Sequence, residues 1–434
     1  MKKLLTLTSA LLLPGAVFAA DLSSIYNMAA SSDPEIEAAR AAREASSYNV
    51  MIARGALLPQ AQVSYTHTHL EYEIKDSALD IPEYDLGSLE VSAGMSIFDL
   101  NKWYSYKAAR SGNDNGNFEL QMSEQQLLMR TAEAYFNALR AEDNLSTANA
   151  ELKAVQRALE QTKQRYDVGL IAITEVHEAQ AAYDLSYASL LGQRANREVQ
   201  YEILAQLTGE KISGVSALKS SVAMSDPQPQ DAEEWVASGL EKFPGLLMVQ
   251  SQVEAARLQR NATRSQHMPT VELFASYKDG DQAFGFEDPL DASTTSYGVK
   301  VTVPLLAGGS LYAASKQSAL NYASADYQLE KTRRDVKQNI RSLYLQVRTD
   351  VLNINARSQA IRSARSALDA TQTGYKVGTR NIVEVLDAQK KVYQAERDYA
   401  NARYDYILNL LSLKFYAGTL NEADIEMLNG WLES

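Results

Sequence analysis

One long internal repeat constrains the fold of this chain more than any other feature of its sequence. The stretch YDVGLIAITEVHE at 166–178 has a near-copy, YKVGTRNIVEVLD, at 375–387, about 209 residues later. The same offset, with a drift of one residue, relates further markers in the two halves: Pro34 and Pro244, Arg54 and Arg264, Pro59 and Pro269, Leu159 and Leu368, Gln180 and Gln389, and Gly209 and Gly418. A repeat of this length indicates one structural unit present twice, so the halves are expected to fold alike and to pack side by side.

The repeat and its flanks set the expected domain organisation. We expect a signal peptide at 1–20, a first structural repeat at 21–209, a linker at 210–231, a second structural repeat at 232–418 and a short C-terminal segment at 419–434. Each repeat is expected to contain a helix, a β-hairpin and a long helix hairpin.

The first 20 residues have the pattern of a secretory signal peptide. A basic head at 1–3 precedes a largely apolar run at 4–18, and Ala19 and Ala20 form a small-residue cleavage site. The mature chain is therefore expected to begin near Ala20 or Asp21, outside the cytoplasm. No later segment approaches the roughly 18 consecutive apolar residues that a transmembrane helix needs.

Composition and motifs argue against several functional classes. The formal net charge of −12 argues against a nucleic-acid partner, because phosphate binding requires clustered Lys and Arg. The chain has no cysteine, which excludes disulfides and cysteine-based zinc sites. Its four histidines form no HExxH or His-Asp-Ser pattern, and no phosphate-binding glycine loop is present. We expect no enzymatic activity, no cofactor and no metal site.

Apolar residues at alternating steps of three and four predict long supercoiled helices. In the first half this seam contains Leu145, Ala148, Leu152, Val155, Leu159, Thr162 and Tyr166. Long helices are expected at about 109–166 and 310–376, with return helices at about 174–207 and 382–416, and further helical patterns cover 34–54 and 232–264.

Four segments alternate between apolar and polar side chains, as the strands of an outer-membrane barrel do. They cover 63–74, 88–97, 271–277 and 296–305, and the acidic segments 75–87 and 279–295 are expected to be surface loops. Four strands cannot close a barrel, since the smallest known membrane barrels have about eight. Either the strands form a soluble sheet or several copies of the chain share one barrel. The second option also accounts for the secretion signal and the long helices.

Several motifs resemble the TolC family of outer-membrane efflux and export ducts. They are LLPQ at 57–60, SIFDLNKW at 96–103, VGLIAITEV at 168–176, VGTRNIVEVLDA at 377–388, NARYDYILN at 401–409 and GTLNEAD at 418–424. The resemblance implies an α+β membrane protein in which three chains, with four strands each, form a twelve-stranded barrel continued by a coiled-coil tunnel. Residues 210–231 and 419–434 would then lie in an equatorial region around the helices.

The resemblance also implies location, function and partners. The homotrimer would sit in outer-membrane lipid of a Gram-negative cell and extend through the periplasm, as a passive exit duct gated at its periplasmic tip. It would serve tripartite efflux pumps and type I protein secretion, with a periplasmic adaptor (membrane fusion protein) and an inner-membrane RND, MFS or ABC transporter. The alternative is an elongated structural or adhesive coiled-coil envelope protein without channel activity.

Two glycines mark the points where a long helix turns back into its return helix. Gly169 and Gly378 are expected as helix C-caps in the left-handed conformation, which glycine adopts without steric cost. The resemblance implies that these turns are also the tips at which the adaptor docks.

Glu384 and Asp387 follow the second glycine turn. Asn381 and Glu384 have the spacing of a capping box, and acids in a first helical turn interact favourably with the helix dipole. However, a step of three residues places both carboxylates on one helix face, and symmetry around a tunnel would make that face a ring that selects cations. The resemblance implies that these residues form the acidic constriction at the entrance.

The resemblance further implies a gate between the two hairpins. Glu175 and Thr174 in the first repeat would bind Tyr375 and Arg380 in the second and hold the entrance shut. The alternative is an ordinary surface ion pair, which contributes about 0–1 kcal/mol.

Overall fold

The computed structural model describes residues 19–71, 83–282 and 290–433. Most of the expected signal peptide, and parts of the loops expected at 75–87 and 279–295, lie outside the described residues. Within these described ranges, no helix is both long enough and apolar enough to cross a membrane.

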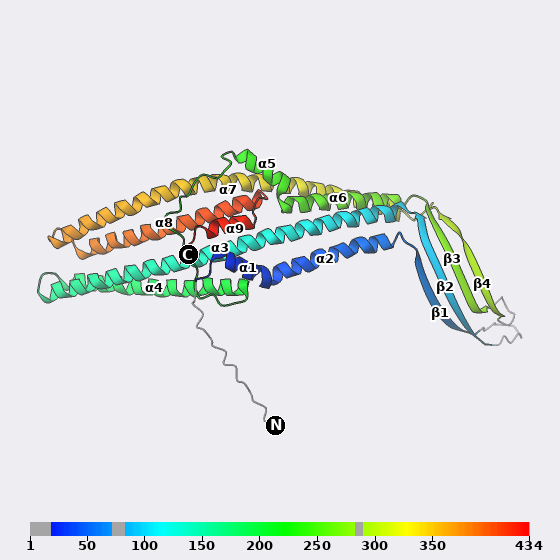
Figure 1. Ribbon diagram of the computed structural model, residues 1–434, viewed down its shortest axis with the longest axis horizontal. Coiled ribbons are helices and arrows are strands. Elements are labelled where there is room, and N and C mark those ends of the chain that lie inside the picture. The colour runs from blue at the N-terminus through cyan, green and yellow to red at the C-terminus, as the bar shows by residue number, and fades with distance from the viewer. Residues whose placement is uncertain (1–18, 72–82, 283–289, 434) are drawn as a thin grey trace, which may run out of the picture. The chain divides into compact units, whose positions relative to one another are not determined.

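The same order of elements occurs twice along the chain (Figure 1): two shorter helices, two strands and two long helices. The first set is α1 Leu22–Ser32, α2 Pro34–Gly55, β1 Gln60–Leu70, β2 Tyr84–Phe98, α3 Leu100–Asp167 and α4 Ile173–Thr208. The second set is α5 Ala232–Lys242, α6 Pro244–Ser265, β3 Thr270–Gln282, β4 Leu290–Thr302, α7 Ser310–Lys376 and α8 Ile382–Tyr416, and α9 Glu422–Asn429 follows. Equivalent helices match in length: 11 residues each for α1 and α5, 22 each for α2 and α6, 68 and 67 for α3 and α7, and 36 and 35 for α4 and α8.

The long helices were predicted closely, with one shifted start. Helices α7 and α8 have the expected bounds, whereas α3 begins at Leu100 rather than near 109. The reason is local: the Asp99 carboxylate accepts a hydrogen bond from the Lys102 backbone N–H at 3.1 Å, which is an N-cap contact.

Among the shorter elements the sequence prediction was less accurate. The single helix expected at 232–264 is two helices, because Pro244 disfavours helical geometry at Phe243, whose ψ of 116° is extended. Helices α1 and α9 were not expected. Both begin at capping residues, Asp21 and Asn421, whose side chains accept backbone hydrogen bonds.

The four strands form one antiparallel sheet in the order β1-β2-β3-β4. All four expected strands are present, but their bounds differ: β1 ends at Leu70 rather than 74, and β4 ends at Thr302 rather than 305. The expected loops were also too long, because β2 begins at Tyr84, β3 continues to Gln282 and β4 begins at Leu290. One face carries rows of apolar side chains, such as Met95, Leu273 and Val299 in neighbouring register positions. Many of these are exposed in the single chain, including Tyr297 at 82%. The opposite face carries serines and glycines together with paired charges such as Glu272 and Lys300.

Two compact units make up the chain, and each takes segments from both halves of the sequence. Among the described residues, one unit contains 19–37, Ser123–Phe243 and 336–433, and its regular elements are helices. The other contains Ala38–Met122 and Pro244–Asp335, including the sheet.

The core of the helical unit lies among its long helices. Its largest fully buried side chains include Tyr135 and Phe136 on α3, Leu204 on α4, Ile340 on α7 and Ile407 on α8. The predicted seam continues from this core along α3, where Ala148, Val155, Leu159 and Thr162 are all buried. The unit therefore has a packed centre from which two helix hairpins, α3–α4 and α7–α8, extend to the glycine turns.

Candidate functional site

The two hairpin tips end in the same backbone turn. Gly169 has φ of +75° and Gly378 has φ of +80°, the left-handed conformation predicted for both. The N–H that follows each glycine bonds back to a carbonyl five residues earlier: Leu170 to Arg165 and Thr379 to Gly374, each at 2.9 Å. This is the six-to-one bond of a Schellman motif, which satisfies helix-end carbonyls.

Asn381 caps helix α8, but the expected capping box is only half present. The Asn381 side-chain oxygen accepts a hydrogen bond from the Glu384 backbone N–H at 3.0 Å. The Glu384 carboxylate does not complete the box; it pairs instead with Arg380, one turn earlier. Gly374 leaves room for Arg380 in this position, because a Cβ at residue 374 would lie only 2.7 Å from the Arg380 Cγ.

Asp387 lies one turn beyond Glu384 on the same helix. Its carboxylate is 2.8 Å from the Lys391 Nζ, and both side chains are more than half exposed. The two acids expected to form the constriction therefore each pair with a nearby cation, Arg380 in the turn before α8 and Lys391 on α8. Both acidic side chains remain accessible to solvent beside these cations.

The structure does not join the expected gate partners directly. Arg380 bonds to Glu384 rather than to Thr174, which is exposed in the first turn of α4. The Tyr375 hydroxyl and the Glu175 Oε2 are both buried, and neither has a hydrogen-bond partner within 19–71, 83–282 and 290–433. Leaving such groups unsatisfied is costly, typically about 1–3 kcal/mol each.

A contact that the sequence did not predict connects the two hairpins. The Arg165 guanidinium lies over the Tyr375 ring, 4.5 Å from the centroid, in a cation–π interaction between α3 and α7. At the 209-residue offset, Arg165 is the equivalent of Gly374. The difference between these two equivalent positions is the feature of the sequence from which the contact could have been predicted. Gly374 makes room for Arg380, whereas Arg165 reaches the Tyr375 ring.

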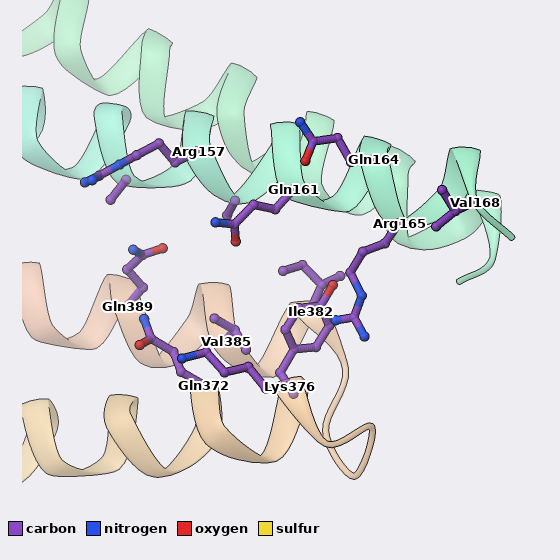
Figure 2. Close-up of a pocket in the computed structure, with 13 residues that line it drawn as sticks. Arg157, Gln161, Gln164, Arg165, Val168, Gln372, Lys376, Ile382, Val385 and Gln389 are labelled. Atoms are coloured by element: carbon purple, nitrogen blue, oxygen red, sulfur yellow. The ribbon is translucent and has the colours of Figure 1, made fainter. Parts of the chain in front are cut away.

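A cavity of about 790 Å³ lies beside this contact. Figure 2 shows Gln161 and Arg165 extending from α3 toward the α7–α8 hairpin, whereas Arg157 runs along α3 and Gln164 points away from the hairpin. The lining on the other side comes from Gln372 and Lys376 on α7 and from Ile382, Val385 and Gln389 on α8. The cavity thus lies between the C-terminal part of α3, from Ala154 to Arg165, and the hairpin of α7 and α8.

Polar contacts between α3 and α8 hold the hairpins together closer to the core. The Tyr404 hydroxyl donates to the Asp143 Oδ2 at 2.7 Å, and the Arg140 guanidinium is 2.6 Å from the Asp405 carboxylate. Burial raises the pKa of the Asp143 carboxyl above its usual range, and burial also raises the pKa of the Tyr404 hydroxyl. These α3–α8 contacts therefore include a carboxylate that is costly to ionise.

Comparison with known proteins identifies the family of this chain. The family model described as outer membrane efflux protein matches residues 25–210 and again 235–419. The chain belongs to the outer membrane efflux protein family.

Relatives in this family cover the whole chain. It is 35% identical to the outer membrane protein TolC of Vibrio cholerae, over 100% of this chain and 99% of that protein. It is 34% identical to TolC of Escherichia coli, over 100% and 90%, and 27% identical to the alkaline protease secretion protein AprF of Pseudomonas aeruginosa, over 96% and 88%.

Solved structures of outer-membrane channels share the fold. The outer membrane protein VceC of Vibrio cholerae matches with a TM-score of 0.80 at 21% identity, over 92% of this chain and 96% of that one. The open state of the MtrE channel of Neisseria gonorrhoeae matches with a TM-score of 0.72 at 18% identity, over 92% and 91%. This efflux protein is thus an outer-membrane exit duct, and its family consists of channel proteins rather than enzymes.

Proposed function

We propose that three copies of the chain form one twelve-stranded barrel, continued through the periplasm by a tunnel built from their helix hairpins. The sheet carries this proposal. Its outer strands, β1 and β4, are edges within the chain, and its apolar face is exposed. In lipid every unpaired edge group costs several kcal/mol, so the edges must pair with those of neighbouring copies.

The repeat of the sequence is proposed to be a duplication of one unit. The equal helix lengths, the recurring order of elements and the two separate matches to the family model all support it. Three chains with two hairpins each would then place six similar hairpins around the tunnel.

Within the tunnel, Glu384 and Asp387 are proposed to form a ring of carboxylates at the entrance. Their side chains are 38% and 58% exposed, and they lie one turn apart on one helix face. Such a ring favours cations and binds multivalent ones.

The gate is proposed to involve an exchange of partners. In this conformation Arg380 pairs with Glu384, while Glu175 and Tyr375 each keep a buried polar atom without a partner. A closed tip would satisfy these atoms if Tyr375 bonded to Glu175 and Arg380 moved to Thr174.

A passive duct needs an energised partner in the inner membrane. We propose that the tips at Gly169 and Gly378 meet a periplasmic adaptor, which connects them to an RND, MFS or ABC transporter. Relatives named for the secretion of proteases, AprF of Pseudomonas aeruginosa and PrtF of Dickeya chrysanthemi, support protein export of the type I kind alongside efflux.

Single-channel recording in planar bilayers tests the duct and its ring. The purified protein should give small cation-selective currents that a trivalent cation blocks from the periplasmic side. Glu384→Gln combined with Asp387→Asn should weaken this block by about tenfold or more, because the carboxylates supply the attraction. Glu178→Gln, an exposed acid on α4, is the matched control.

The same recordings test the gate and the alternative function. Tyr375→Phe combined with Arg380→Ser should raise the conductance, and an unchanged conductance would remove these residues from the gate. Complete absence of channels in the wild-type protein would favour the structural or adhesive envelope protein instead.

A further inference from the structure

We propose that the cavity between α3 and the α7–α8 hairpin binds a small organic dianion with an apolar body. The cavity volume of about 790 Å³ lies within the range of roughly 300–1,000 Å³ typical of small-molecule sites. The charge, hydrogen-bonding capacity and length of the cavity each point to this class of ligand.

The charged side chains that line the cavity are cations. Arg157, Arg165 and Lys376 contribute three positive charges, and the described lining residues include no aspartate or glutamate. Within the described part of the chain, none of the three forms an ion pair: Arg157 donates to the Lys153 carbonyl, and Arg165 lies on the Tyr375 ring. In a protein with a net charge of −12, a cluster of cations without ion-pair partners favours an anion.

Two lining side chains have unused hydrogen-bonding capacity. The Tyr375 hydroxyl and the Gln389 Oε1 are both buried and find no hydrogen-bond partner among the residues that the structure describes. A buried polar atom without a partner is unusual in a folded protein and requires an explanation. The Tyr375 O–H can donate to an anionic oxygen, and so can the amide of Gln389, because its oxygen and nitrogen are interchangeable by a flip.

Part of the cavity lining is apolar and open to solvent. Val168 lines the cavity and is 70% exposed, whereas Ala154, Ile382 and Val385 also line it but are almost fully buried. An inorganic anion would leave the exposed Val168 side chain in water. A ligand with a short hydrocarbon body would cover it while its charged ends reach the cations.

The spacing of the cations favours a ligand that is charged at both ends. Arg157 and Arg165 are eight residues apart on α3, which corresponds to about 12 Å along the helix. Lys376 is on α7, so one end of the dianion would connect the two hairpins near the tip. The ligand would therefore contact both α3 and the α7–α8 hairpin.

Titration calorimetry on the full-length protein in nanodiscs tests this proposal with a matched pair of probes. Suberate carries a carboxylate at each end of a short alkyl chain, and 1,8-octanediol has the same carbon chain without charge. Suberate should bind saturably, whereas the diol should not bind at the same concentrations. Absence of suberate binding by the wild-type protein would overturn the proposal.

Substitutions locate the binding. Arg157→Gln and Arg165→Gln should each weaken suberate binding by about tenfold or more, as expected for loss of a charge-assisted bond. Lys163→Gln is the control: it removes one positive charge from the same helix, but its Nζ faces Gln180 at 3.4 Å and does not line the cavity. An equal loss of affinity in the control would show that suberate responds only to overall charge and would overturn the site.

Tyr375→Phe separates the hydrogen bond from the packing, because it keeps the ring under Arg165 and removes only the hydroxyl. It should weaken binding several-fold with unchanged helix content by circular dichroism, and unchanged affinity would contradict the role of the hydroxyl. Calorimetry needs no channel activity. Failure of the anion site and failure of the proposed duct are therefore observed separately.

Discussion

At the scale of single residues, Gly378 shows how a backbone angle fixes the position of a tip. Its φ of +80° lies in the left-handed region, and a Cβ at this position would meet no heavy atom within 4 Å. Any cost of substitution there is therefore conformational rather than steric. For a residue with a Cβ that cost is about 1–2 kcal/mol.

Gly378→Ala should accordingly lower the melting temperature of the helices, measured by circular dichroism in detergent. Gly192→Ala is the matched control, because Gly192 lies inside α4 and its Cβ would also meet nothing. In a helix interior the same substitution stabilises by about 0.5–1 kcal/mol. A decrease of similar size in both variants would contradict the argument from φ.

Residues near the tip differ in how far the sequence predicts them. The glycine turns and the Asn381 cap depend on neighbours within five residues, so local patterns were sufficient. The Arg165–Tyr375 stacking joins side chains that are distant in the sequence, and no local pattern encodes it. Glu384 could have completed its capping box, but its pairing with Arg380 depends on the space above Gly374.

At the scale of elements, the pairing of α3 with α8 should respond to pH through Asp143. Its pKa is raised by burial, so the folded chain holds the proton more tightly than the unfolded chain does. Stability then falls as the pH rises from the ordinary value of about 3.9 through the raised pKa. Above that interval the buried carboxylate is ionised and its desolvation opposes folding.

Asp143→Asn should remove this dependence while retaining an acceptor for Tyr404. Melting curves of the variant and the wild type should agree in acid, and the variant should melt higher near neutral pH. Asp184→Asn, at an exposed carboxylate on α4, controls for the loss of one negative charge. A difference between variant and wild type that stays constant with pH would rule out Asp143 as the source.

The elements themselves were predictable in proportion to their periodicity. Long seams predicted α7 and α8 well because burial repeats over many turns, whereas short α1 and α9 provide few periods. The break between α5 and α6 is encoded by Pro244, but the helical pattern continues on both sides of it and predicts one helix.

At the scale of the whole molecule, the edges of the sheet determine how copies must meet. The chain has no cysteine, so introduced cysteines report only the contacts under test. Tyr65 on β1 and Tyr297, Val299 and Val301 on β4 are apolar residues exposed in the single chain. If β1 of one copy pairs with β4 of the next, one combination of these positions must lie opposite one another.

We expect one of three double-cysteine variants to cross-link into covalent trimers in outer membranes. Each variant combines Tyr65→Cys with Tyr297→Cys, Val299→Cys or Val301→Cys. Denaturing gels without reductant measure this, and the four single variants are the controls. Cross-linking that stops at two chains in every combination would contradict a closed ring of three.

The assembly could not be derived from the pattern of one chain. Alternation predicted the strands and their apolar face, and the requirement to pair edges in lipid predicted several copies. The number of copies depends on the tilt and stagger of the strands in a closed barrel, and these are properties of the assembly.

The unequal lengths of α3 and α7, 68 and 67 residues, have a consequence for the two tips. Equivalent residues are offset by 210 where these helices begin and by 209 where they end, so α3 contains one extra residue. One residue of an α-helix corresponds to a turn of about 100°. In helices of constant twist, equivalent residues beyond that point therefore differ in phase by this angle, and their side chains point in different directions. A single inserted residue can in this way make the two hairpins of a duplicated chain present different side chains to the same neighbour.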